Sequence, residues 1–262
     1  MFVSIKMANG CFRLNILVFM VIKKYREFVF EKMKIIPLSD EDFEKIPVEI
    51  GPKYKYFPKT KEELQSIIRE RMDKDGNKCD LNDIDTSEIM DMSDLFRGQH
   101  LQYFNGNISK WNVSKVESMD GMFCDSLFDG DISRWDVSNV KNMEKMFWES
   151  YFNNDISKWN VSKVENMSYM FWWAKRFNSD ISEWDVSNVE NMKSMFDHDK
   201  AFNQDISKWN VCNVTNMDFM FRDTDFNQNI SGWNVCNVTT HVDMFYSNPI
   251  DIQPNKQPKF NK

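Results

Sequence analysis

The chain has 262 residues and a formal net charge of −7 at pH 7, and 42% of its residues are hydrophobic and 15% aromatic. This apolar and aromatic content excludes an intrinsically disordered chain. The charge is uneven, because residues 1–80 carry 16 Lys and Arg against 13 Asp and Glu, whereas residues 81–262 carry 17 against 27. The acidic C-terminal part argues against nucleic acid as a partner, since phosphate binding requires a basic surface.

Residues 1–54 are predicted to be an N-terminal extension of uncertain structure. Their longest apolar run, residues 14–22, contains Asn15 and is too short to span a bilayer. Lys23 and Lys24 follow at the place where a signal peptide has its small-residue cleavage site. We therefore expect no membrane span and no signal peptide or anchor, which favours a cytoplasmic location.

Residues 55–83 are predicted to form a helical N-terminal cap. Thr60 and Glu63 have the spacing of a capping box, which marks the start of a helix. The apolar residues that follow share one helical face; they are Leu64, Ile67, Ile68 and Met72. We expect a helix over about 61–73 that covers the N-terminal end of the part that follows.

Residues 84–247 repeat one line of sequence. Six copies read approximately Phe-Asn-x-Asp-Ile-Ser-x-Trp-(Asn/Asp)-Val-(Ser/Cys)-x-Val-x-x-Met-x-x-Met-Phe, and an atypical unit beginning at Ile84 precedes them. The tryptophans that mark the copies are spaced 24 or 25 residues apart; they are Trp111, Trp135, Trp159, Trp184, Trp209 and Trp233. A repeat of this length predicts a stack of small units that share one core.

Within one repeat, the pattern predicts a short strand followed by a short helix. Trp111 and Val113 alternate with polar residues, as in a half-buried strand. Ser114 and Glu117 then form a second capping box, and the apolar residues after them lie on one helical face; they are Val116, Met119, Met122 and Phe123. The fold class predicted is α/β, a leucine-rich-repeat-like solenoid of about seven coils, each a short parallel strand plus a short helix, with the helical cap at its N-terminal end.

Residues 248–262 are predicted to be a Pro-rich polar tail. Pro249, Pro254 and Pro258 cannot donate backbone hydrogen bonds, and we expect them to protect the last edge of the stack.

Residues 55–245 resemble the BspA-like bacterial surface-protein repeat, a unit of about 25 residues that is also abundant in mycoplasma-type lipoproteins. The resemblance rests on the nearly verbatim recurrence of Phe-Asn-x-Asp-Ile-Ser-x-Trp-Asn-Val-Ser. It implies an elongated, non-catalytic module that many members display at the cell surface, with a ligand that is largely undefined.

The repeated apolar residues have two interpretations. The tryptophans could form a stacking platform for sugars or bases, and the methionines and phenylalanines could line a binding groove. Their spacing favours two walls of the core instead.

A column of aspartates recurs in the turns, at Asp131, Asp155, Asp180 and Asp205. Calcium binding is one interpretation, and hydrogen bonding to the backbone of each turn is the one we favour, because Asn107 and Asn229 stand at the same position. No metal site, cofactor or catalytic residue is predicted.

The outward positions beside the tryptophans are the candidate binding face. Two neighbouring columns make it up: Lys110, Arg134, Lys158, Glu183 and Lys208 in one, and Asn112, Asp136, Asn160, Asp185 and Asn210 in the other. Repeat proteins commonly bind partners on such faces. A solvated surface without function would have the same composition.

The sequence therefore predicts a non-enzymatic repeat protein that binds a macromolecular partner, a protein or a glycan. The first alternative is a structural protein that stacks end to end through its last coil, so a monomer or weak self-association is expected. The second alternative is a glycoside hydrolase that uses paired aspartates of adjacent coils.

Overall fold

The computed structural model describes residues 2–7, 10–15, 54–98 and 100–260. The chain divides into two compact units, Met1–Gly51 and Pro52–Lys262. In the first unit, β1 (Phe2–Met7) and β2 (Gly10–Asn15) pair antiparallel, with Met7 opposite Gly10 and Phe2 opposite Asn15. The rest of the predicted N-terminal extension, residues 16–53, lies outside the described residues.

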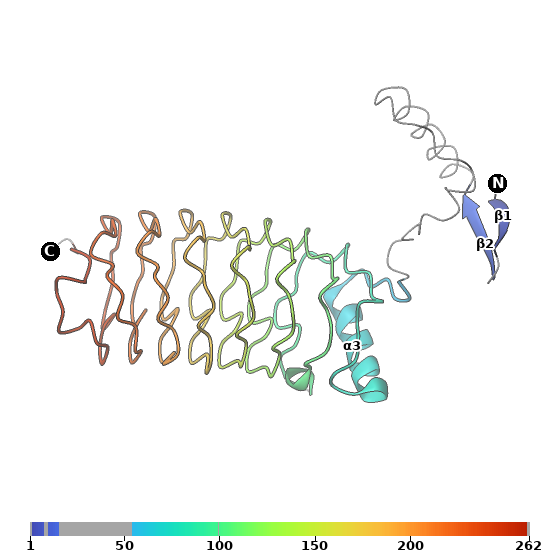
Figure 1. The fold of residues 1–262 in the computed structure, drawn as a ribbon, viewed down its shortest axis with the longest axis horizontal. Helices are drawn as coiled ribbons and strands as arrows, with labels where there is room; N and C mark the ends of the chain where they lie inside the picture. The colour runs from blue at the N-terminus through green and yellow to red at the C-terminus, as the bar shows by residue number, and fades with distance from the viewer. Residues whose placement is uncertain (1, 8–9, 16–53, 99, 261–262) are drawn as a thin grey trace, which may run out of the picture. The chain divides into compact units, whose positions relative to one another are not determined.

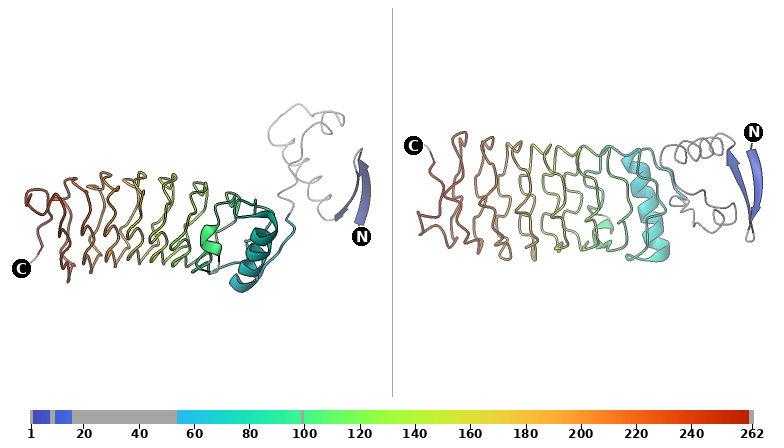
Figure 2. Two further views of the ribbon diagram at one scale, coloured as in Figure 1. Left: turned by 90° about the horizontal axis from the view of Figure 1, so that it is seen from below. Right: turned by 45° about the horizontal axis from the view of Figure 1, so that its top comes forward.

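In the second unit, the chain winds through successive coils that follow one another from α3 (Lys61–Asp75) to the C-terminus (Figure 1). The turned views in Figure 2 show the same order. Single parallel bridges link equivalent residues of neighbouring coils, in the order Asp91, Ser118, Asn142, Asn166, Asn191, Asn216 and Thr240. Each sequence repeat therefore makes one coil.

Each coil makes two consecutive tight turns between its first methionine and the residues after its phenylalanine. In one coil, the N–H of Met146 donates to the carbonyl of Met143 at 3.3 Å, and Lys145 between them has a φ of 53°. A second turn follows at once, with Glu149 at a φ of 54°. A left-handed residue at the third position reverses the chain, so the segment cannot continue as an α-helix.

The remaining N–H groups of this segment point along the stack. Those of Met143, Lys145, Phe147 and Glu149 donate to carbonyls of the next coil at 2.8–3.0 Å. These bonds use the N–H groups that an α-helix would direct at its own fourth preceding residue. The stack thus provides acceptors that an isolated repeat does not have.

The prediction of a short helix in each repeat is therefore wrong, because α3 is the only α-helix among the described residues and the segment from Ser114 to Phe123 is not helical. The predicted strand at 111–113 is also absent as a paired strand, since the bridge of this coil lies at Ser118. Ser114 does not cap a helix; its hydroxyl donates to Oδ1 of Asn112 at 2.7 Å.

The predicted capping helix is confirmed, and α3 ends two residues beyond the expected position. Thr60 accepts the N–H of Glu63 at 3.2 Å, and the Glu63 carboxylate accepts the N–H of Lys59 at 2.6 Å. One face of α3 is buried in the core through Leu64, Ile68 and Met72.

Helix α3 covers the start of the stack. Its Gln65 side chain donates to the carbonyls of Asp94 and Leu95 in the first coil, each at 3.2 Å. A 3₁₀-helix, η1 (Leu101–Tyr103), follows this coil. Backbone acceptors at this end are therefore occupied by a side chain of the cap.

The core confirms that the repeated tryptophans, methionines and phenylalanines face inward. The six marker tryptophans are each only 3–4% exposed. Each indole N–H donates to the carbonyl of a residue in the preceding coil, as Trp159 does to Ile132 at 3.1 Å. The phenylalanines stack along the array, with ring centroids of Phe147 and Phe171 at 5.6 Å. The indole faces are consequently unavailable as a ligand platform.

The C-terminal residues pack against the last coil. Ile230 donates its N–H to the carbonyl of Lys256 at 3.0 Å, and the Lys256 ammonium donates to the Asn227 side chain at 2.7 Å. The ring of Phe260 stacks on His241 at a centroid distance of 3.9 Å. This segment replaces part of a next coil.

Candidate functional site

The ten residues of the predicted binding face are all exposed and lie on one side of successive coils. The inward tryptophan between each pair fixes the two flanking side chains toward solvent. An ion pair joins two neighbouring members of the first column, with Lys208 Nζ 3.2 Å from Glu183 Oε1. The structure therefore places all ten side chains on the surface and brings Glu183 and Lys208 into contact.

The second column of this face also shapes the backbone. The Oδ1 atoms of Asn112, Asp136 and Asn160 accept the N–H two residues later at 3.1–3.2 Å. Asp185 does the same at 3.1 Å. One carboxylate or amide oxygen is thus held by the turn, and the rest of the side chain is presented to solvent.

A shallow cavity of about 350 Å³ is formed by residues that follow the face residues within each repeat. It is lined by Lys141, Lys163, Glu165, Asn188, Glu190 and Asn213. The amides of Asn188 and Asn213 donate to carbonyls of the preceding coil at 2.6 and 2.7 Å. These residues were not among the predicted site residues, although they occupy two repeated positions of successive coils.

An ion pair borders this cavity, between Lys141 Nζ and Glu117 Oε2 at 2.8 Å. The hydrogen bond and the charge of Glu117 raise the pKa of Lys141, and Lys141 lowers the pKa of Glu117. Both groups remain charged at neutral pH, so the outward surface presents fixed positive and negative charges.

The turn aspartates hydrogen-bond to the backbone of their own turns, which is the interpretation that the sequence favoured over calcium binding. Asp155, Asp180 and Asp205 accept the N–H of the serine two residues later at 2.9–3.0 Å. Those backbone N–H groups, followed by the serine hydroxyls, lower the pKa of each of these three carboxyl groups. Asp131 makes the same contact at 3.0 Å.

These aspartates share one environment, whereas a glycosidase needs an acid and a base whose pKa values differ. Among the described residues, no group of three or more His, Cys, Asp or Glu side chains is arranged to hold a metal ion.

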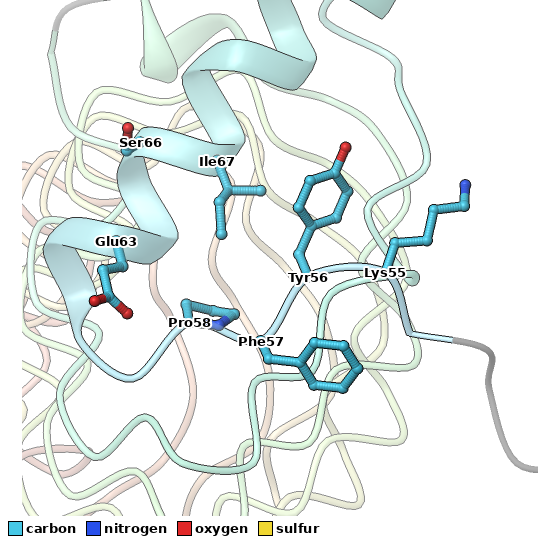
Figure 3. A pocket seen from close by; sticks show the side chains of 7 residues that line it. All are labelled: Lys55, Tyr56, Phe57, Pro58, Glu63, Ser66 and Ile67. Carbon is cyan, nitrogen blue, oxygen red and sulfur yellow. The ribbon is translucent and has the colours of Figure 1, made fainter.

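A cavity of about 430 Å³ lies beside the start of α3 (Figure 3). Tyr56, Phe57, Pro58 and Ile67 line it together with Glu63, whose carboxylate is engaged in capping the helix. The ring of Phe57 is 58% exposed. Lys55 and Ser66 complete the lining, so this cavity has an apolar wall beside a few polar groups.

Three tryptophans outside the marker column form an aromatic corner that sequence reasoning missed. Trp148, Trp172 and Trp173 lie in the second tight turn of two adjacent coils, and His198 follows in the next coil. Trp148 and Trp172 pack edge to face at 5.3 Å, and the Trp173 ring lies 5.4 Å from Trp172. The chain has nine tryptophans, so the three that break the spacing were the signal for this corner.

One buried carboxylate organises this corner. Asp197 accepts from Nε1 of Trp172 at 3.0 Å and from Nδ1 of His198 at 2.7 Å. Arg222 binds both oxygens of Asp197, at 2.9 and 2.7 Å. These charge-assisted bonds fix the side chains of three successive coils.

A second buried carboxyl group, Asp199, replaces the small residues Ser150 and Thr224 of other coils. Its Oδ1 accepts the N–H groups of Ala201 and Phe202 at 3.0 and 3.2 Å, whereas no hydrogen-bond donor contacts Oδ2 within the described residues. Burial raises the pKa of Asp199 well above its ordinary value of 3.8.

No helix in the described part of the chain has the length and apolar character needed to cross a bilayer. Neither the curated proteins nor the solved structures contain a match to the chain.

Coils that recur with the sequence and bridge their neighbours in parallel define a repeat protein. The chain belongs to the family described as Mycoplasma protein of unknown function, DUF285, which matches residues 63–161 and again residues 149–253.

Proposed function

We propose that this protein is a non-enzymatic binding module that holds a macromolecular partner, a protein or a glycan, on its outward polar face. The proposed architecture is a solenoid of about seven coils that resembles the BspA-like surface repeats. The observation that carries the proposal is the exposure of all ten face residues in register along successive coils.

The apolar residues support this proposal through their position. The repeated Trp, Val, Met and Phe residues are buried in one continuous cluster with Ile and Leu. Function then depends on what the outward positions present, which is an array of charged and amide groups on a rigid backbone. Rigid presentation reduces the entropy lost when a partner binds.

The carboxylates support a binding role better than a hydrolytic one. The turn aspartates Asp131, Asp155, Asp180 and Asp205 have lowered pKa values, so they are ionised at neutral pH and none is a general acid.

Affinity capture with quantitative mass spectrometry tests the proposal. The bait is the full chain, compared with a variant in which Lys110, Arg134, Lys158 and Lys208 are changed to Glu. We expect recovery of a specific partner from lysate or cell-surface extract to fall at least tenfold in this variant. A control variant with the same change of charge places Glu at exposed lysines off the face, Lys59, Lys74, Lys78 and Lys259. Equal recovery by both variants and the wild type would remove the polar face as the binding surface.

A second candidate function, end-to-end assembly, is favoured by the last coil. The N–H groups of Asp243 and Phe245 correspond to those that pair with the next coil elsewhere, and they have no acceptor among the described residues. Val242 and Tyr246 at this end are 55% and 63% exposed. Size-exclusion chromatography with light scattering over a wide concentration range tests assembly. A mass that rises in the wild type and not in the Val242→Glu variant supports it, and a constant monomer mass contradicts it.

A further inference from the structure

The aromatic corner departs from the repeat in a way that folding does not explain. At the fifth and sixth positions after the first methionine, one coil has Trp172 and Trp173, where the two coils that follow have Asp197–His198 and Arg222–Asp223. The fold therefore accepts charged or polar residues at both positions. Large aromatic side chains there serve something other than the core.

The backbone conformation of this corner does not require aromatic residues. Tyr169 and Trp173 occupy left-handed positions, with φ of 59° and 51°. The two adjacent coils also have positive φ at the equivalent positions, which hold Lys145 and Glu149 in one coil and Ser194 and His198 in the other. The left-handed conformation therefore belongs to every coil, and a bulky aromatic residue is not favoured in it.

The corner presents one open ring on a rigid support. Trp173 is 48% exposed, and it packs against Trp172 and His198 at centroid distances of 5.4 and 5.8 Å. Both of those rings are hydrogen-bonded to the buried Asp197. A ligand therefore meets a single platform that is already in place before binding.

Two cations follow Trp173 on the same coil, and a third lies on the next coil. Lys175 and Arg176 are exposed, and the Lys175 ammonium lies 4.5 Å from the centre of the Tyr151 ring of the preceding coil. On the next coil, the Lys193 ammonium lies 5.7 Å from the centre of the Tyr169 ring. Residues 167–179 contain no Asp or Glu, although the chain as a whole has a net charge of −7.

The nearby carboxylates are mostly neutralised. Asp197 is paired with Arg222, and Glu144 is paired with Lys145. Asp223 is paired with Lys200 at 2.8 Å. Glu149, on the preceding coil, is half-buried.

We propose that the aromatic corner binds an acidic polysaccharide, with one anionic pyranose ring over Trp173 and its carboxylate or sulfate at Lys175, Arg176 and Lys193. Such a sugar has an apolar ring face and a negative charge in the same unit, which matches an indole flanked by cations. Single-stranded nucleic acid requires successive stacking rings, and here the rings next to Trp173 are packed edge-on against one another. The inference is independent of the proposed polar-face function, because the corner shares none of its ten residues.

Calorimetric titration of the full chain with polygalacturonate and with heparin tests the proposal and separates carboxylate from sulfate recognition. Methyl-esterified polygalacturonate keeps the sugar chain without the charge, polyglutamate keeps the charge without the ring, and oligothymidylate probes nucleic acid. We expect binding of polygalacturonate or heparin and at least tenfold weaker binding of the other three probes. Binding of neither acidic glycan, or equal binding of polyglutamate or oligothymidylate, overturns the proposal.

Variants locate the site. Trp173→Gly suits the left-handed backbone, so it should fold normally and weaken glycan binding at least tenfold. Lys175→Glu with Arg176→Glu should do the same. The polar-face variant with Glu at positions 110, 134, 158 and 208 should retain its affinity to within a factor of two or three. Unchanged affinity in Trp173→Gly, or loss of affinity in the polar-face variant alone, would contradict this location.

Discussion

The nine tryptophans divide into two groups that the same fold uses in opposite ways. The six marker indoles are buried and donate to carbonyls of the preceding coil, and Trp159 is typical of them. Trp173 stands at a left-handed turn and is half-exposed, and its neighbour Trp172 donates to a carboxylate. A tryptophan that recurs with the repeat therefore contributes to stability, whereas one that interrupts the repeat contributes to a surface.

The largest effect is expected from Trp159→Ala. The change leaves a cavity between coils and removes the hydrogen bond to the Ile132 carbonyl. Large-to-small core substitutions of this kind cost about 3–5 kcal/mol. Chemical denaturation measures the loss, with Trp173→Ala as the matched control that should cost much less. A Trp159→Ala variant that melts within a degree or two of the wild type would contradict the inward assignment.

Asp199→Ser should stabilise the protein at neutral pH. Serine fits this position in another coil, where Ser150 is fully buried. The substitution also removes the buried Oδ2 of Asp199, which no hydrogen-bond donor contacts among the described residues. Relief of such a buried group is worth about 1–3 kcal/mol.

The pH dependence of this gain follows from the raised pKa of Asp199. Below its ordinary value of 3.8, both the folded and the unfolded chain hold the proton. As the pH rises above that value, only the unfolded chain releases it, so the folded state loses relative stability until the pH passes the raised pKa. The gain in free energy of unfolding of Asp199→Ser over the wild type should therefore grow from about pH 4 upward. A gain that does not change with pH, measured by denaturation at several pH values, would contradict this explanation.

Trp173→Gly should leave stability unchanged or raise it slightly. A left-handed conformation costs a residue with a side chain about 1–2 kcal/mol, and glycine avoids that cost but has more freedom in the unfolded chain. Thermal melting of this variant beside Trp173→Ala separates conformational strain from lost contact area. A large destabilisation by glycine would mean that Trp173 is part of the core.

The smallest effect is expected from Asp180→Asn. The amide keeps an oxygen for the N–H of Ser182, now at 2.9 Å, but loses the charge that strengthens this bond. Because the pKa of Asp180 is lowered, its contribution is present above the ordinary value of 3.8 and is lost as the pH falls through the folded pKa. The difference from the wild type should stay below about 1 kcal/mol, as for exposed polar groups, and should disappear in acid. As the pH rises, the stability of Asp180→Asn relative to the wild type should therefore fall, whereas that of Asp199→Ser should rise.

The sequence predicts α3 and the inward columns because both depend on local spacing. Thr60 and Glu63 mark the helix start, and the recurrence of Trp and Val beside polar residues identifies the buried side of each coil. The polar face is predicted for the same reason, since residues next to a buried tryptophan must point outward.

The two tight turns could not be separated from a helix by apolar spacing alone. Met143, Met146 and Phe147 lie on one side in either conformation, and the decision depends on carbonyls that another coil supplies. Gly121 and Asp94 at third turn positions were a usable signal, because both residues favour left-handed backbone. The aromatic corner could not be predicted from the consensus, because Trp148, Trp172 and Trp173 lie outside the repeated tryptophan position.

Hydrogen exchange of the nine indole N–H groups, followed by NMR, tests the central claim most directly. If the marker tryptophans face a continuous core, their six indole signals exchange slowly and together, at rates set by unfolding of the array. The Trp173 indole exchanges fast. Marker signals that exchange as quickly as that of Trp173 would contradict the stacked-coil core on which every other inference depends.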